Sequence, residues 1–270
     1  MSPKPPIPRE HGAWGLLLQP FVAGAILGGQ WTNLFVPALG MVLMGFLMRE
    51  PLTVMAREMW VFRRRGDQAV RAAWWAGVEG AALLGCLLTL ARWAPLGALA
   101  ALAGVGLVLT GAAVAVSLKN RQRSVAFQVV SAAGLGTTGL LAVLVGTGGI
   151  PGWAWWLWGL LSGHAMASIL VVHARLRARA GRKSDRVERP WLAYAGQAGQ
   201  LAAAGVVAMV EWRLAVPLMA SALANGIELW RLRTPAHLEE ALTRVGYRTL
   251  AVASLHMVLT ITCLWPLARG

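Results

Sequence analysis

The chain has 270 residues, of which 57% are hydrophobic and 13% charged, with 14 tryptophans and a formal net charge of +14. This composition excludes an ordinary soluble domain. The basic residues lie in short segments between apolar runs, without a zinc finger or helix-turn-helix pattern, so no nucleic-acid partner is predicted. The sequence therefore predicts an all-α, polytopic transmembrane helix bundle in a lipid bilayer.

Nine apolar runs predict nine spans, because a helix needs about 20 residues to cross a hydrocarbon core about 30 Å thick. In chain order the predicted helices are residues 13–29, 34–48, 72–91, 96–117, 125–145, 153–173, 191–210, 214–230 and 249–267. The eighth run contains Pro217, Asn225 and Glu228. This run is retained as a span because the arginines that follow it would otherwise lie on the opposite side of the membrane from the other basic segments. We expect residues 1–270 to form a single transmembrane domain.

The basic residues predict the orientation. Twenty-two of the 25 Lys and Arg residues fall in segments that this topology places on one side. Short cytoplasmic loops retain positive charge, so that side is predicted to be the cytoplasm. The N-terminus is then cytoplasmic, the C-terminus is extracytoplasmic, and the location is the bacterial inner (plasma) membrane.

Two local patterns predict packing. The glycine pairs Gly24/Gly28 and Gly159/Gly163 are each four residues apart, a spacing that favours close contact between membrane helices. After the second span, apolar residues recur at helical spacing beside several arginines, at Leu52, Met55, Met59 and Phe62. This pattern predicts an amphipathic helix along the headgroups, either a surface anchor or a lid over a cavity.

Strongly polar side chains in or beside the spans give the functional signal, because such groups are costly in hydrocarbon and normally face the bundle interior. Measured from the nearest cytoplasmic arginine, they lie in the inner half of the membrane or near its midplane. Each one alone is explained as an interhelical hydrogen bond, but their one-sided placement predicts a pocket open to the cytoplasm. Its predicted lining is His11, Trp14, Gln19, Glu79, Gln128, His164, Gln197, Gln200, Asn225, Glu228 and His256.

Arginines at the mouth of this pocket are candidates for binding an anionic headgroup, because guanidinium groups form paired hydrogen bonds with phosphates. They are Arg49, Arg57, Arg175, Arg177 and Arg179. The alternative is that they are ordinary cytoplasmic loop residues that touch anionic lipid.

The N-terminal segment carries the sharpest local pattern. Pro8-Arg9-Glu10-His11-Gly12-Ala13-Trp14, followed by Pro20-Phe21, resembles the start of the YwiC-like family of bacterial integral membrane proteins. The resemblance extends more weakly over the whole chain. It implies the membrane architecture and does not imply a reaction.

The predicted layout is also similar to that of the UbiA-type intramembrane prenyltransferases, which have nine helices, a cytoplasm-facing cavity and functional loops after helices 2 and 6. In that superfamily, Asp-rich motifs hold Mg²⁺ against a prenyl diphosphate. At the first location this chain offers Glu50, with Glu58 one position off, and at the second it has His173 and no acid until Asp185. Mg²⁺ is therefore doubtful, and no cofactor or metal site is predicted.

The resemblance implies a pocket for an isoprenoid or an anionic lipid. If the protein is an enzyme, it is a degenerate prenyltransferase-like transferase acting on a lipid, with Glu50, Glu58, His11 and His173 as candidate catalytic groups. Two alternatives stay open. One is a haem- or quinone-binding module that uses His11, His164 and His256, and the other is a small-molecule transporter, which the apolar outer half disfavours.

Overall fold

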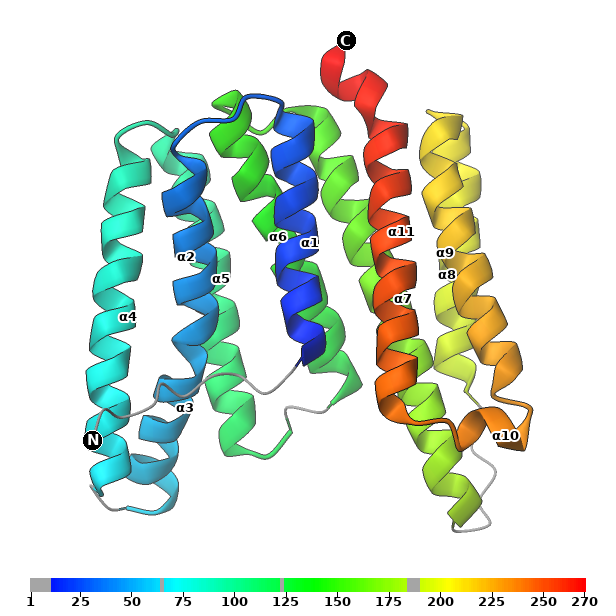
Figure 1. Cartoon of the computed structure of the whole chain (residues 1–270), viewed down its shortest axis with the longest axis horizontal. Coiled ribbons are helices and arrows are strands. Elements are labelled where there is room, and N and C mark those ends of the chain that lie inside the picture. The colour runs from blue at the N-terminus through cyan, green and yellow to red at the C-terminus, as the bar shows by residue number, and fades with distance from the viewer. Residues whose placement is uncertain (1–10, 64–65, 122–123, 184–189) are drawn as a thin grey trace. The chain divides into compact units, whose positions relative to one another are not determined.

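The computed structural model describes residues 11–63, 66–121, 124–183 and 190–270, and every regular element in these ranges is helical (Figure 1). The long helices are α1 (His11–Gly28), α2 (Phe35–Leu47), α4 (Asp67–Ala91), α5 (Leu96–Leu118), α6 (Val125–Thr147), α7 (Gly152–Lys183), α8 (Trp191–Ala208), α9 (Trp212–Arg231) and α11 (Leu242–Arg269). Three short segments complete the described part: α3 (Arg49–Ala56), the π-helical turn η1 (Arg57–Val61) and α10 (Pro235–Leu238). For the described residues, the predicted all-α fold with nine long helices is confirmed.

Six helical stretches of the described chain are long and apolar enough to cross a membrane. They are Phe35–Val61, Asp67–Ala91, Leu96–Leu118, Val125–Thr147, Gly152–Ala180 and Thr243–Arg269. Gly12–Gly28 is a shorter apolar helix, and α8 and α9 are more polar because they carry Gln197, Gln200, Asn225 and Glu228. The chain is therefore a multi-pass membrane protein, while nine passes and their orientation stay predictions.

Several helices extend beyond the predicted spans on the side of the basic residues. α7 continues to Lys183 instead of ending at residue 173, and α11 begins at Leu242 instead of residue 249. Hydrophobicity marks only the part of a helix that lies in hydrocarbon, whereas backbone hydrogen bonding continues into the polar region. The prediction located the helices and underestimated their polar ends.

The chain divides into two compact units. Unit 1 comprises Met1–Ser124 and Thr137–Ile150, and unit 2 comprises Val125–Gly136 and Pro151–Gly270, so α6 contributes to both. Within unit 1, α4 packs on α2 and α3, and α3 also contacts α5. Within unit 2, α8 contacts α7 and α9, and α11 contacts the same two helices. A single domain over the whole chain stays a prediction.

Close contact between α1 and α6 in unit 1 depends on glycine. A Cβ atom at Gly24 would lie 2.3 Å from the Gly139 carbonyl oxygen, and one at Gly28 would lie 3.4 Å from Gly146 Cα. The predicted contact of the Gly24/Gly28 pair is thus confirmed. For Gly159 and Gly163 the same prediction is wrong, since a Cβ there meets no described atom within 4 Å.

The amphipathic segment after the second span is helical, as predicted. α3 continues from α2 through helical backbone at Met48 (φ −56°, ψ −21°) and passes into η1. Met59 and Phe62 are exposed, and Arg57 donates a hydrogen bond to the Ser117 carbonyl oxygen at the end of α5 (3.0 Å). A position along the headgroups stays a prediction.

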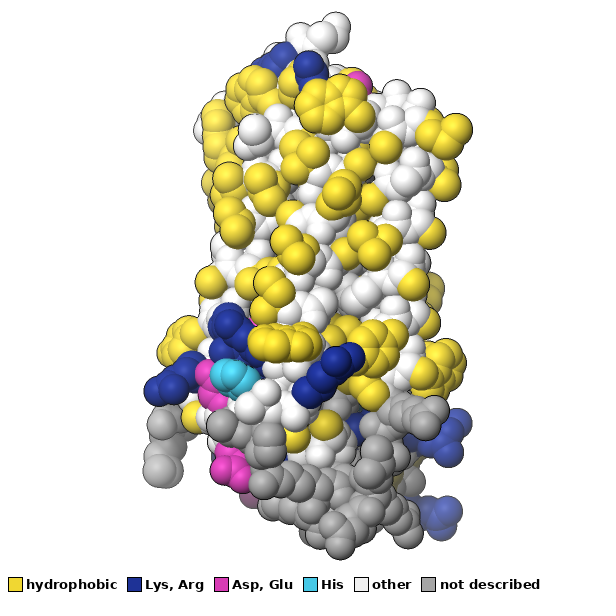
Figure 2. All heavy atoms as spheres, turned by 90° about the vertical axis from the view of Figure 1, so that its right-hand side faces the viewer, with side chains coloured by type: hydrophobic (Ala, Val, Ile, Leu, Met, Phe, Trp, Pro, Cys, Tyr) yellow, Lys and Arg dark blue, Asp and Glu magenta, His cyan; other side chains and the backbone are white. Residues whose placement is uncertain are grey.

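One face of unit 2 is mostly apolar. Figure 2 shows apolar side chains along its length, with basic, acidic and histidine side chains gathered mainly toward its lower end. The exposed apolar side chains of α8 and α9 include Leu201, Val206, Met219, Leu223, Ile227 and Trp230. An apolar exposed surface of this kind is what a bilayer requires.

Candidate functional site

The interior of unit 2 is polar. Besides Arg175, eight polar side chains of α7, α8, α9 and α11 are buried: Ser162, His164, Gln197, Gln200, Ser221, Asn225, His256 and Thr260. Five of them bond to a neighbouring helix, namely His164, Gln200, Ser221, Asn225 and His256, whereas Gln197 donates to the Ala193 carbonyl oxygen of its own helix. The five amides and imidazoles among the eight were predicted to line a pocket, and the structure brings them into one core.

His164 is the centre of this core. Its Nδ1 lies 2.7 Å from Ser221 Oγ, and its Nε2 lies 3.5 Å from Ser168 Oγ. Ser221 donates to Gln200 Oε1 (3.1 Å), and Ser168 donates to Asn225 Oδ1 (3.2 Å). One imidazole therefore connects polar groups from α7, α8 and α9.

His256 of α11 stacks on His164. The ring centroids are 4.2 Å apart, the rings are tilted by 17°, and His256 Nε2 lies 3.2 Å from the Leu160 carbonyl oxygen. The rings are in van der Waals contact, so no haem or quinone ring fits between them. This geometry does not favour a module in which His164 and His256 hold a cofactor between them.

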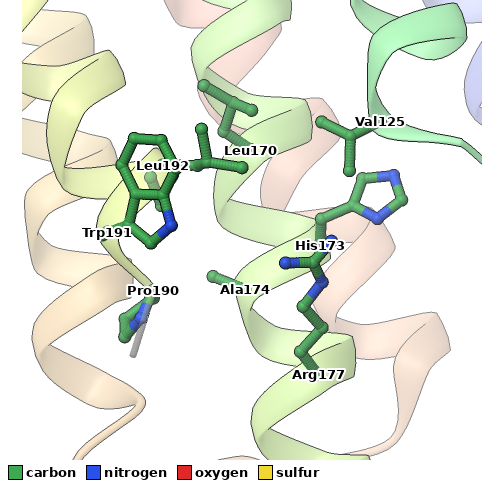
Figure 3. Close-up of a pocket in the computed structure, with 9 residues that line it drawn as sticks. Val125, Leu170, His173, Ala174, Arg177, Pro190, Trp191 and Leu192 are labelled. Carbon is green, nitrogen blue, oxygen red and sulfur yellow. The ribbon is translucent and has the colours of Figure 1, made fainter. Parts of the chain in front are cut away.

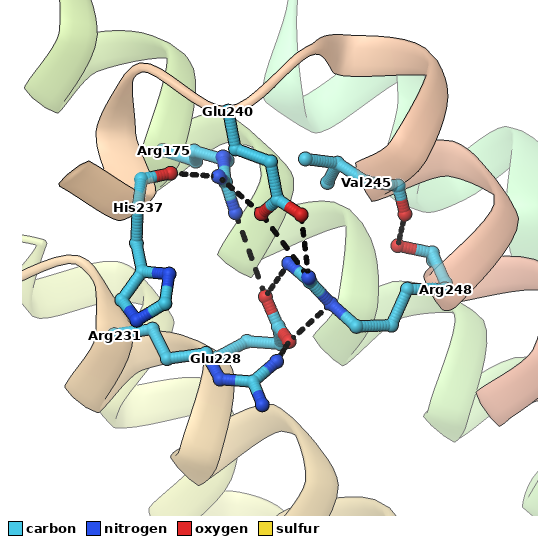
Figure 4. A network of polar contacts seen from close by, with 8 residues as sticks. Arg175, Glu228, Arg231, His237, Glu240, Val245 and Arg248 are labelled. Atoms are coloured by element: carbon cyan, nitrogen blue, oxygen red, sulfur yellow. Dashed lines mark hydrogen bonds and ion pairs between the residues drawn. The ribbon is translucent and has the colours of Figure 1, made fainter.

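An ion-pair network lies where α7, α9 and α11 meet (Figure 4). Glu228 pairs with Arg231 (2.9 Å), Arg248 (2.7 Å) and Arg175 (3.5 Å). Glu240 pairs with Arg248 (3.0 Å) and Arg175 (3.3 Å). The end of unit 2 that holds these five residues is called the charged end below.

The network contains more arginine than carboxylate, and its groups are largely sequestered. Arg175 is 3% exposed and also donates to the His237 carbonyl oxygen. Burial raises the pKa of Glu240, but its hydrogen bonds to Arg248 and the charges of Arg248 and Arg175 outweigh burial and hold that pKa below its ordinary value. Arg175, predicted to bind an external anion, is thus occupied by internal carboxylates.

A small hollow of about 20 Å³ lies beside the C-terminal half of α7, with α6 and α8 as its other walls (Figure 3). Its lining is Val125, Leu170, His173, Ala174, Arg177, Pro190, Trp191, Leu192 and Ala193. His173 Nε2 lies 2.8 Å from Gln128 Oε1, which fixes the ring orientation. Arg177 is exposed and lies one helical turn after His173. The hollow therefore combines a cation and an imidazole with an indole and aliphatic side chains.

A second, larger groove of about 750 Å³ runs along α9. Its lining is apolar and comprises Leu201, Val216, Met219, Ala220, Ala222, Leu223, Gly226, Ile227 and Trp230. It offers space for hydrocarbon, and the indole N–H of Trp230 is the one polar side-chain group among these nine lining residues.

The remaining candidates lie in unit 1. Trp14 packs edge-on against Phe46, with 5.0 Å between ring centroids, and Gln19 is half-buried. Glu50 pairs with its neighbour Arg49 (3.1 Å). Arg49 also lies over the Phe46 ring, 5.6 Å from its centroid.

Two carboxylates of unit 1 are buried. Glu58 is 3% exposed, and Glu79 is 5% exposed, with its Oε2 atom making no hydrogen bond to the described residues. The side chain of His11 lies outside the described residues. A pocket shared by all the predicted residues of both units stays a prediction.

Sequence reasoning missed Ser168, Ser221, Trp191 and Glu240. The two serines had a usable signal, since Ser168 follows His164 by four residues and Ser221 precedes Asn225 by four. Serine is only mildly polar, so it does not stand out in an apolar run as histidine does. Within the described ranges, no group of three or more His, Cys, Asp or Glu side chains is placed to hold a metal ion.

A family model described as "YwiC-like protein" matches residues 7–143, which is about half of the chain. No curated protein and no solved structure matches the chain.

Proposed function

The chain belongs to the YwiC-like family, and from that premise and the geometry of unit 2 we propose that it binds an anionic lipid, an isoprenoid phosphate or a phospholipid. The proposed site is the hollow between α6, α7 and α8. The observation that carries the proposal is the mixed lining of this hollow, in which Arg177 and His173 lie beside Trp191 and aliphatic side chains.

Each part of the lining suits one part of such a ligand. The Arg177 guanidinium offers forked donors for a phosphate, and the half-buried His173 is held in place by Gln128. Trp191 has the amphipathic ring that is enriched at membrane–water interfaces. Val125 and Leu170 offer apolar contact to the first carbons of a lipid chain.

The core of unit 2 supports a pocket that opens toward one side. His164, Ser221 and His256 lie between the charged end and a set of fully buried leucines on the other side. These leucines are Leu157, Leu214 and Leu264. A polar inner half and an apolar outer half are the arrangement expected of a site that takes its ligand from one leaflet.

A UbiA-like layout belongs to the proposal. The hollow lies at the end of α7, the sixth long helix in the chain, which is where the resemblance places a functional segment. At the segment after the second helix, Glu50 is paired with Arg49. The proposal assigns binding to the hollow and assigns no transfer reaction.

The test compares lipids and matched arginine variants. Purified protein is mixed with a polyprenyl phosphate, a neutral polyprenol of the same length, or phosphatidylglycerol, and binding is measured by native mass spectrometry. We expect the phosphate-bearing lipids to be retained and Arg177→Gln to weaken their binding roughly tenfold, since a hydrogen bond to a charged group contributes about 1.5–3 kcal/mol.

Arg233→Gln is the control, because Arg233 is also an exposed arginine and does not line the hollow. Equal binding by wild type and both variants would leave only the general attraction of basic residues for anionic lipid and would eliminate the specific site. Preference for one of the two anionic lipids identifies the source of the phosphate.

A further inference from the structure

The buried core of unit 2 supports an inference that does not depend on lipid binding. We propose that His164 is a proton-binding site inside the helix bundle and that its proton enters from the charged end of unit 2.

The hydrogen bonds around His164 contain one acceptor too many when the ring is neutral. Ser221 and Ser168 have two hydroxyl protons to donate. Their acceptors are Gln200 Oε1 (3.1 Å from Ser221), Asn225 Oδ1 (3.2 Å from Ser168) and the unprotonated nitrogen of the imidazole. Three acceptors therefore compete for two protons, and one buried acceptor is left without a donor.

A second proton on His164 removes this mismatch. A cationic imidazole donates from both nitrogens, so Ser221 and Ser168 accept from the ring and donate to their amides. Asn225 Nδ2 lies 3.4 Å from Ser221 Oγ and donates to the same oxygen. Hydrogen bonding to the charged form favours protonation, whereas burial opposes it. In the protonated state both ring nitrogens and the amide oxygens of Gln200 and Asn225 are paired, while Gln200 Nε2 has no partner among the described residues in either state.

The stacked ring of His256 limits the pair to one proton. Its Nε2 lies 3.2 Å from the Leu160 carbonyl oxygen and donates to it, so the one N–H of a neutral His256 is bonded, while its Nδ1 has no hydrogen-bond partner among the described residues. Two cationic rings with centroids 4.2 Å apart would repel each other. A neutral His256 instead offers its π face to the cationic His164.

A polar path connects this site with the charged end. Ser221, Asn225 and Glu228 follow each other on α9 at four- and three-residue spacing, which places them on one face. Glu228 lies seven residues beyond Ser221, or about 10 Å along the helix. In the opposite direction, Leu157 and Leu214 are 0% exposed. On that side the buried polar side chains are the hydroxyls of Ser162 and Thr260, which do not titrate, whereas the other side leads through Asn225 to Glu228. The proton is therefore assigned the path through Asn225.

The positions of the ionisable groups on the four packed helices are consistent with proton entry from the charged end. Toward the charged end, α7 contributes Arg175, α9 contributes Glu228 and α11 contributes Arg248. The buried polar side chains of α8 are the amides Gln197 and Gln200, which do not titrate, and Tyr194 of that helix is exposed. On the far side, Cys263 follows His256 on α11 and is half-buried.

The proposal is tested by titration of the ring. Nitrogen NMR of histidine-labelled protein, with His164 assigned from its loss in His164→Gln, reports the protonation of each imidazole nitrogen. We expect His164 to become doubly protonated as the pH is lowered through the range in which the protein stays folded. Ser168→Ala and Ser221→Ala should each lower its proton affinity roughly tenfold, because each removes an acceptor of the cation.

Thr249→Ala is the matched control, since this hydroxyl donates only within its own helix, to the Val245 carbonyl oxygen. A ring that stays neutral over the whole range overturns the proposal, and so does a titration that neither serine variant changes. Ser221 is 1% exposed, so its variant is the more demanding for folding. If Ser221→Ala does not fold, the titration of the wild type and of Ser168→Ala, at a half-buried position, still tests the proposal.

Discussion

At the scale of single residues, Glu240 shows how one carboxylate joins separate helices. It precedes α11, receives hydrogen bonds from Arg248 of that helix (3.0 and 3.1 Å), and also pairs with Arg175 of α7. Its side chain is 11% exposed, so solvent screens these ion pairs only in part. Glu240 therefore stabilises the charged end in its ionised form.

Loss of this charge should destabilise the protein at low pH. The pKa of Glu240 lies below its ordinary value of 4.5, so its contribution is complete above that value and is lost as the pH falls through the folded-state pKa. We expect Glu240→Gln to lower the free energy of unfolding at pH 7 by about 1–2 kcal/mol. The variant should also show a weaker loss of stability below the ordinary value. Equilibrium unfolding in mixed micelles at several pH values measures both effects.

Asp67, an exposed carboxylate in the first turn of α4, provides the control. If Asp67→Asn changed the acid dependence as much as Glu240→Gln, the effect would come from net charge and not from the ion pairs with Arg175 and Arg248.

At the scale of elements, the positions of the helices were predicted from the sequence more accurately than the residues of the candidate site. Long apolar runs define membrane helices because the bilayer requires every backbone group to be bonded within the helix. The C-terminal end of α7 and the N-terminal end of α11 were missed because they contain many polar residues, and hydrophobicity does not identify helical structure outside the hydrocarbon core. His164 and Asn225 were recognised because their side chains are costly in hydrocarbon. Glu240 was missed because it lies outside every predicted span.

Which predicted groups meet could not be read from spacing along single helices. The stacking of His164 on His256 depends on how α7 and α11 are rotated about their axes relative to each other. The residue pattern within either helix does not determine that rotation. The same applies to glycine. Both predicted glycine pairs have the same spacing, but only Gly24/Gly28 faces another backbone.

This difference between the glycine pairs gives a test at the level of helix packing. Gly24→Ala should destabilise the protein by about 1–3 kcal/mol, because its Cβ would lie 2.3 Å from the Gly139 carbonyl oxygen and α1 would have to move away from α6. Gly163→Ala should be neutral or slightly stabilising, since open space surrounds the new methyl group and alanine favours the helix. Thermal unfolding in detergent compares the two variants. A larger loss at Gly163 would contradict the close contact of α1 with α6.

At the scale of the whole molecule, the number of membrane crossings decides on which side of the membrane the charged residues lie. The six described stretches that are long and apolar enough to span do not include α8 and α9, whose inward faces carry buried amides and the part-buried Glu228. A helix with a polar face can cross a membrane when that face packs inside a bundle. In unit 2 the polar faces of α8 and α9 do so, because Gln200, Ser221 and Asn225 bond to one another or to α7. Low hydrophobicity in these two helices thus reflects a shared polar core.

Crossing by α9 predicts opposite accessibility at its two ends. Arg213 lies at its start and Arg233 just after its end, and both are exposed. Cysteine is placed at one position at a time in a background with Cys86→Ser and Cys263→Ser, and cells are treated with a membrane-impermeant maleimide. With the basic segments in the cytoplasm, we expect Arg213→Cys to react in intact cells and Arg233→Cys to react only after permeabilisation. Equal reactivity at both positions would show that α9 does not cross. Reversed reactivity would place the charged end outside the cell and would remove the basis for drawing a ligand from the inner leaflet.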